Sequence, residues 1–195
     1  MLDLRHFPTY QLLLLSMETD ETLRYPIGHY TLPEQPLTAA ERAAYLQQLM
    51  QLPTELRQAL DGLNEIQFET PYRPGGWTVR QVLHHLPDSH LNSYTRFRLA
   101  LTEDNPTIKP YDEAGWAQLP DVAIVPPDVS LILLDALHAR WVVLCSQLTD
   151  AQWLRTWYHP GMQQTVRLDQ ALVMYAWHGK HHVAHITSLR KRMGW

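Results

Sequence analysis

The most evident chemistry in this 195-residue chain lies in four of its eleven histidines, His178, His181, His182 and His185, which stand within one short segment. The surrounding pattern predicts a helix. At about 100° per residue, His178, His182 and His185 fall on one inward stripe with apolar residues, and His181 lies about 60° to one side. Imidazoles four residues apart can bind one metal ion. His178 and His182 therefore have the spacing of a zinc-binding helix, without the glutamate of the HExxH motif.

A structural interpretation competes with the metal site. A single buried histidine is more often a hydrogen-bonded core residue, and the helix dipole favours a histidine near a helix C-terminus. Three histidines on one buried stripe are different, because each would need its own partner, at about 1 to 3 kcal/mol for every group left unsatisfied. One shared ion satisfies all of them, so the pattern favours a metal site.

Two other predicted helices contribute further candidates. His85 is the best inward histidine of the second helix, whereas His84 and His90 are predicted on other faces. Asp88, close to His85, could orient an imidazole or a water, although a solvated surface carboxylate is an interpretation of at least equal weight. His138 lies on the core face of the third helix and is a reserve ligand, for which a hydrogen-bonded core histidine is the better interpretation.

Capping residues and apolar periodicity predict four long helices. They are expected over about 39–60, 79–101, 129–148 and 168–193. Thr38 and Thr78 open the first two with capping boxes, Asp128 is expected to cap the third, and Gly194 closes the last. Pro53 should kink or divide the first helix.

The segments between these helices are also informative. Residues 1 to about 37 hold four prolines without a sustained period, and predict an irregular arm. The proline-rich loop from Glu103 to Pro127 is long for a compact domain, which is typical of a functional lid. Residues 157–166 predict a small β-hairpin around Pro160 and Gly161.

Composition limits the possible classes of protein. With 45% hydrophobic and 18% charged residues, the chain suffices for one well-filled core. A net charge of -4 makes nucleic acid an unfavoured partner, and the short run Leu12 to Leu15 is no membrane span. Cys145 is the one cysteine, which excludes an intrachain disulfide and fits a buried apolar position in a cytoplasmic protein.

Four amphipathic helices with a long crossover loop predict an all-α four-helix bundle, whose metal sites are built from inward side chains of facing helices. His85 and the pair His178 and His182 could then converge. Three imidazoles around zinc leave the fourth position open, which is the arrangement of a catalytic site.

Five motifs in order resemble the YfiT-type metal-dependent hydrolases of the DinB superfamily, over about residues 24–195. They are YPIG (25–28), GGWTVRQV (75–82), HHLPDSH (84–90), PTIKPY (106–111) and YAWHGKHH (175–182). The resemblance implies a DinB-like bundle domain over residues 24–195, preceded by an extension of residues 1–23, and a cytoplasmic homodimer. It also implies one zinc or nickel ion held by His85, His178 and His182. Pro87 departs from the family pattern, which usually has a small non-proline residue there.

Three functions remain open at this point. The resemblance implies a hydrolase, in which the metal activates water. The superfamily also contains thiol S-transferases, including bacillithiol-dependent ones, so the alternative substrate is a low-molecular-weight thiol with an electrophile. The third possibility is a metal-binding bundle without catalysis. Asp88 and His181 are weak candidates for a general base, and Tyr111 and Trp116 belong to the expected lid.

Overall fold

A computed structural model describes residues 20–195. The predicted irregular extension of residues 1–23 lies outside the described residues except for its last four, which belong to the short helix α1 (Asp20–Arg24). Four long helices form the body of the molecule. They are α2 (Ala39–Leu60), α4 (Val79–Thr102), α7 (Pro127–Ser146) and α9 (Leu168–Met193). The all-α fold class is therefore confirmed, together with the four-helix bundle.

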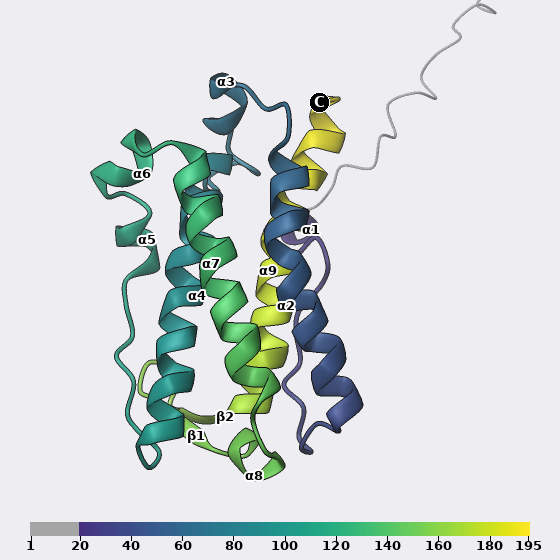
Figure 1. The fold of residues 1–195 in the computed structure, drawn as a ribbon. Helices are drawn as coiled ribbons and strands as arrows, with labels where there is room; N and C mark the ends of the chain where they lie inside the picture. Colours follow the sequence, from purple (N-terminus) through teal and green to yellow (C-terminus); the bar gives the residue numbers. More distant parts are fainter. Residues whose placement is uncertain (1–19) are drawn as a thin grey trace, which may run out of the picture.

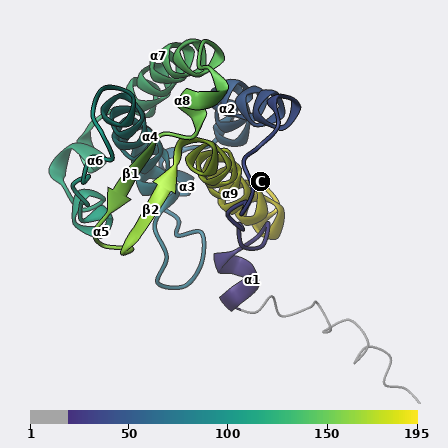
Figure 2. The same ribbon diagram turned by 90° about the horizontal axis from the view of Figure 1, so that it is seen from below.

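The four helices do not pack in chain order. Helix α9 packs against α2 and α4, and α7 packs against the same two helices, so that α7 and α9 lie on opposite corners (Figure 2). Figure 1 shows α2 and α9 running in one direction and α4 and α7 in the other. Because α4 and α7 are parallel neighbours, the chain between them must return along the whole bundle. This requirement explains the long segment from Glu103 to Pro126.

Local signals explain most helix ends. The side chains of Thr38 and Thr78 each accept from the backbone N–H three residues on, completing the predicted capping boxes, and Gly194 has the left-handed backbone that ends α9. The prediction for the third helix is wrong in detail. Helix α7 begins at Pro127 without a side-chain cap, so Asp128 lies inside its first turn. Proline at the first helical position needs no N–H partner and replaces the cap.

The two prolines inside helices divide neither of them. Helix α2 continues through Pro53 and α4 through Pro87. Helix α7 is long and apolar enough to cross a membrane by length and composition, but it packs along α2 and α4 in the bundle.

The shorter elements lie in the connections between the long helices. They are α3 (Glu65–Phe68), α5 (Glu113–Trp116), α6 (Pro120–Ile124), α8 (Asp150–Trp153), β1 (Thr156–His159) and β2 (Gln164–Arg167). Strands β1 and β2 form the predicted antiparallel hairpin, in which Trp157 pairs with Val166 and both side chains are buried. The long loop is not structureless, because α5 and α6 lie within it and its Ile108 N–H donates to the Tyr158 carbonyl of β1.

Two apolar clusters fill the bundle, one toward each end. On α9 the first cluster ends at Tyr175, and the buried part of the second begins at Ile186. The histidine segment lies between them. Helices α2 and α9 come close at this level, since a Cβ atom added to Gly179 would lie 2.3 Å from a methyl carbon of Leu52. Glycine therefore permits the close packing that brings the histidine stripe into the interior.

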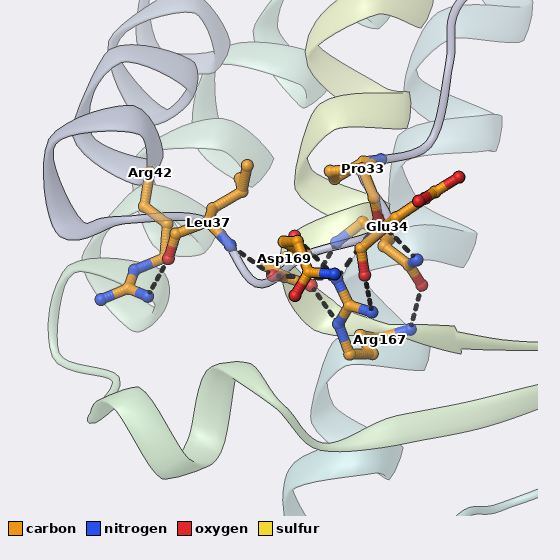
Figure 3. A network of polar contacts seen from close by, with 8 residues as sticks. Pro33, Glu34, Leu37, Arg42, Arg167 and Asp169 are labelled. Atoms are coloured by element: carbon orange, nitrogen blue, oxygen red, sulfur yellow. Dashed lines mark hydrogen bonds and ion pairs between the residues drawn. The ribbon is translucent and has the colours of Figure 1, made fainter.

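A polar network joins the arm to the start of α9 (Figure 3). Asp169, which is fully buried, accepts from the Leu37 backbone N–H at 2.9 Å and from the Arg167 guanidinium at 3.0 Å. Arg167 also donates to three backbone carbonyls of the arm. Residues 33–37 are thus fixed against the bundle.

Candidate metal centre

Three imidazoles from two helices meet between the apolar clusters. His85 comes from α4, and His178 and His182 come from successive turns of α9. One ring nitrogen from each lies within 4.8 Å of the other two, and the Nε2 atoms of His85 and His178 are 3.2 Å apart. Two nitrogens bound to one tetrahedral zinc at about 2.05 Å would be about 3.3 Å apart. The spacing therefore fits a shared metal ion.

The three rings are neutral near pH 7. Burial lowers the pKa of His85 to about 4. The pKa values of His178 and His182 lie well below the usual range for histidine, first because of burial and then because of the neighbouring histidines. His178 has intermediate exposure and lines two cavities. Neutral imidazole is the form that binds a metal.

A chain of buried histidines orients His178. The Leu49 carbonyl can only accept, so Nδ1 of His138 donates to it at 2.6 Å. Nε2 of neutral His138 then accepts from Nδ1 of His90 at 2.8 Å, and Nε2 of His90 accepts from Nδ1 of His178 at 3.1 Å. His178 is therefore protonated on Nδ1, and the lone pair of its Nε2 is directed at the cluster.

A second series of hydrogen bonds, through His185, orients His182 in the same way. Nε2 of His185 donates to the Arg24 carbonyl at 2.9 Å. Nδ1 of neutral His185 then accepts from Nδ1 of His182 at 3.3 Å, so that Nε2 of His182 also carries a lone pair. Either a proton on His85 or a shared cation could hold the Nε2 atoms of His85 and His178 together. The unprotonated Nε2 of His182 favours the cation.

These two series of hydrogen bonds include histidines that the sequence pattern did not assign to the site. His90 was predicted on another face, but it is fully buried and contacts His178. Since α4 packs against both α7 and α9, its buried surface is wider than one stripe. His138 is a hydrogen-bonded core histidine, as the pattern favoured, and His84 bonds to Ser130 of α7 outside the cluster. The stripe argument counted His185 among the histidines that one ion would satisfy, but His185 lies outside the group of three and bonds instead to His182 and to the Arg24 carbonyl.

Two cavities meet at His178. The first, of about 300 Å³, contains all three clustered histidines, with the aromatic rings of Tyr25, Tyr72, Trp77 and Trp177 among its walls. The second, of about 170 Å³, extends from His178 toward the hairpin. Glu113 at the start of α5 lines both. Glu113 is exposed overall, but burial of its carboxyl raises its pKa, which the Arg96 charge partly offsets.

The other predicted residues have different places. Asp88 is half-buried and lines neither cavity, and its pKa is raised to about 6 by burial and by Asp121. His181 lines the first cavity, stacks on Trp177 and has a pKa lowered to about 3 by burial. Tyr111 and Trp116 contact each other in the loop but line neither cavity. The expected lid therefore reaches the cluster through Glu113, which the sequence pattern did not single out.

Comparison with known proteins agrees with this architecture. The sequence profile described as DinB superfamily matches residues 48–186. A Bacillus subtilis (strain 168) relative named "Putative metal-dependent hydrolase YfiT" is 49% identical over 177 residues, which are 91% of this chain and 99% of the relative. A Bacillus cereus relative, also described as a putative metal-dependent hydrolase, is 54% identical over 173 residues, covering 89% of this chain and 98% of its own.

A solved structure extends the comparison to three dimensions. YfiT from Bacillus subtilis, described as a probable metal-dependent hydrolase with an unusual four-helix bundle topology, matches with a TM-score of 0.87. The match is 49% identical and covers 89% of this chain and 99% of the other. The resemblance based on the five motifs is therefore confirmed, and the chain belongs to the DinB superfamily.

Proposed function

We propose that this protein is a metal-dependent hydrolase in which His85, His178 and His182 hold one divalent ion, with zinc the first expectation and nickel the second. The observation that supports the proposal is the convergence of three neutral imidazoles within 4.8 Å. In two of them, His178 and His182, hydrogen bonds leave Nε2 unprotonated. Such an ion supplies Lewis acidity and lowers the pKa of a water or thiol at its open position.

Glu113 is the best placed proton acceptor. It lines the same cavity as the three histidines, and a carboxyl with a raised pKa is a better base near neutral pH than an ordinary one. Asp88 lines neither cavity, and His181 has too low a pKa to hold a proton near pH 7. We therefore assign to Glu113 the role for which Asp88 and His181 were the weak candidates.

The cavity dimensions favour a second candidate function, thiol S-transfer. A cavity of about 300 Å³ has room for more than a water molecule, which occupies about 30 Å³ in the liquid. A low-molecular-weight thiol and an electrophile could enter it together. In this case Glu113 would accept the thiol proton.

Turnover by the zinc-loaded protein tests both candidates. The protein is incubated with ester substrates, and separately with a small thiol and a chloro- or epoxide-bearing electrophile. Metal-dependent, thiol-independent product supports hydrolysis, and a metal-dependent thioether supports transfer. Bound metal without either product would favour the non-catalytic bundle.

Glu113→Gln sharpens the test. It should retain the metal and lower kcat by about 10²- to 10⁴-fold, the usual contribution of a general base. Asp104→Asn is the matched control, since Asp104 is an exposed carboxylate in the same loop that lines neither cavity. An unchanged kcat for Glu113→Gln would remove Glu113 from the mechanism.

A further inference from the structure

The second cavity has a mixed lining that the metal centre does not require. Its walls include Trp157 and Val166 of the hairpin and Met174 of α9, which are apolar, while Arg96 of α4 supplies a cation. His178 and Glu113 separate this cavity from the first one. A molecule bound here would therefore lie directly beside the clustered histidines.

Arg96 is a buried cation for which the described part of the chain supplies no carboxylate partner. Its residue exposure is 9%. Among the described residues its guanidinium makes a single, long hydrogen bond, 3.5 Å from Nη1 to the Tyr175 hydroxyl oxygen. In residues 20–195 no carboxylate oxygen lies within the 4.0 Å that defines an ion pair with it. Glu113 acts on Arg96 only from a longer distance.

The other buried arginine of α4 shows what the fold normally provides. Arg80, with 7% exposure, donates to the carboxylates of both Glu65 and Glu69. Burying a guanidinium without an anion is costly, so buried charges are almost always paired. Arg80 meets this rule within residues 20–195, and Arg96 does not. The missing partner of Arg96 is expected from outside the chain.

We propose that the second cavity binds the carboxylate of the substrate at Arg96, with an apolar segment of the substrate against Trp157, Val166 and Met174. A planar guanidinium matches a carboxylate with two parallel hydrogen bonds. Glu113 adds negative charge to the wall, which disfavours polyanions and favours a monocarboxylate. The proposal rests on the proposed function, because it places the reactive end of the substrate beside His178.

Calorimetric titration with hexanoate and its neutral analogue hexanamide tests the proposal. Hexanoate should bind the wild-type protein at least about tenfold more tightly than hexanamide, the factor expected for a charge-assisted pair. Arg96→Met keeps most of the apolar stem and should abolish this preference. Arg98→Met, on the exposed side of the same helix, is the matched control and should retain it.

Two further measurements separate this proposal from the metal site. The titrations are performed on zinc-loaded and on metal-free protein, so that a carboxylate bound to the metal cannot be mistaken for one bound to Arg96. Failure to bind zinc would defeat the proposed function, but the metal-free titration would still decide the role of Arg96. If Arg96→Met does not fold, Arg96→Lys replaces it. Lysine keeps the charge but cannot make the two parallel hydrogen bonds of a guanidinium, so this variant should retain only part of the preference for hexanoate over hexanamide.

Equal affinity for acid and amide in the wild-type protein would overturn the proposal. A preference that survives in folded Arg96→Met would overturn it as well. Tighter binding of inorganic phosphate than of hexanoate would contradict the monocarboxylate class.

Discussion

Two regions of the same helix bury polar groups in opposite ways. At the start of α9, Asp169 accepts from the Leu37 backbone and from Arg167, and Arg167 donates in turn to carbonyls of the arm (Figure 3). At this place the protein itself supplies the partners for the charges and hydrogen-bonding groups of Asp169 and Arg167. Three turns later, His178 and His182 donate from Nδ1 to His90 and His185, and the Nε2 lone pair of each is left for the cluster, where Nε2 of His178 lies 3.2 Å from Nε2 of His85.

This difference separates a structural polar cluster from a site. A buried group that only supports the fold is satisfied by its neighbours, since each unsatisfied group costs about 1 to 3 kcal/mol. A group that binds a ligand must keep one position open. Changes in the Asp169 network should therefore lower the free energy of unfolding, whereas changes in the histidine cluster should lower the amount of bound metal. The predictions below test that division.

The largest expected effect is the loss of metal from ligand variants. Alanine at His85, His178 or His182 should reduce bound zinc from about one ion per chain to nearly none, because two imidazoles alone bind weakly. Elemental analysis after gel filtration measures it. His84→Asn is the control, since His84 is a buried α4 histidine bonded to Ser130 outside the cluster. Equal metal in the triple variant and the wild type would discard the site.

The second prediction addresses the structural region. Asp169→Asn should lower the free energy of unfolding by about 1 to 3 kcal/mol, because it takes the anion from the half-buried Arg167 and weakens a buried hydrogen-bond network. Urea denaturation measures this, and zinc stoichiometry should not change. Asp150→Asn removes a carboxylate that is 88% exposed from its pair with Arg42, and should cost less than about 1 kcal/mol. Loss of zinc binding in folded Asp169→Asn would contradict the division.

The third prediction is that the ion stabilises the fold. His85 and His178 are 93 positions apart, so the unfolded chain has no assembled site. Zinc at a hundredfold excess over its Kd should then add about 2.7 kcal/mol. The corresponding rise in Tm is roughly 5 to 11 °C for a domain of this size. A chelator that removes the zinc at about pH 7.5 and leaves Tm unchanged would disprove this linkage.

The pH dependence of the third prediction has a definite sign. Unfolded histidines have a pKa of about 6.5, whereas burial lowers the pKa of His138 to about 4. Between these values the unfolded chain takes up protons that the native protein does not, so stability falls as pH decreases from about 6.5 toward 4. Protons also compete with zinc for imidazole. At about pH 5 the metal-free protein should therefore melt lower, and zinc should add little.

The smallest expected effect comes from the residues that orient the ligands. His138→Leu removes the acceptor of His90, which frees His90 to donate to His178 and places the His178 proton on Nε2. Zinc affinity should fall by about 10- to 100-fold, as for other outer partners of metal ligands. His138→Gln again provides an acceptor for His90 and should recover part of the lost zinc affinity. Chelator competition measures the affinity, and ¹⁵N NMR of the His178 ring reports the proton position directly. Unchanged affinity in His138→Leu would show that the chain of histidines does not orient His178.

Local patterns in the sequence determined the elements and two of the three histidines of the cluster. The caps at Thr38, Thr78 and Gly194 were predictable because they depend on residues within one turn. The hairpin was predictable from its turn and its β-branched residues. The shared stripe of His178 and His182 follows from helix periodicity alone. Helix periodicity also favoured His85 as the inward histidine of α4, and the family resemblance implied the same three ligands. Whether His85 meets the pair depends on which faces of α4 and α9 pack together.

Only the tertiary structure decided the surroundings of the cluster. The link from His178 through His90 and His138 to the Leu49 carbonyl joins all four long helices, and its members share no sequence period. Glu113 reaches the cavity because parallel packing of α4 and α7 returns the loop along the bundle. Arg80 and Arg96 are both buried arginines of α4, but within residues 20–195 carboxylates fold only against Arg80. Such partners are set by long-range packing, which local residue patterns do not contain.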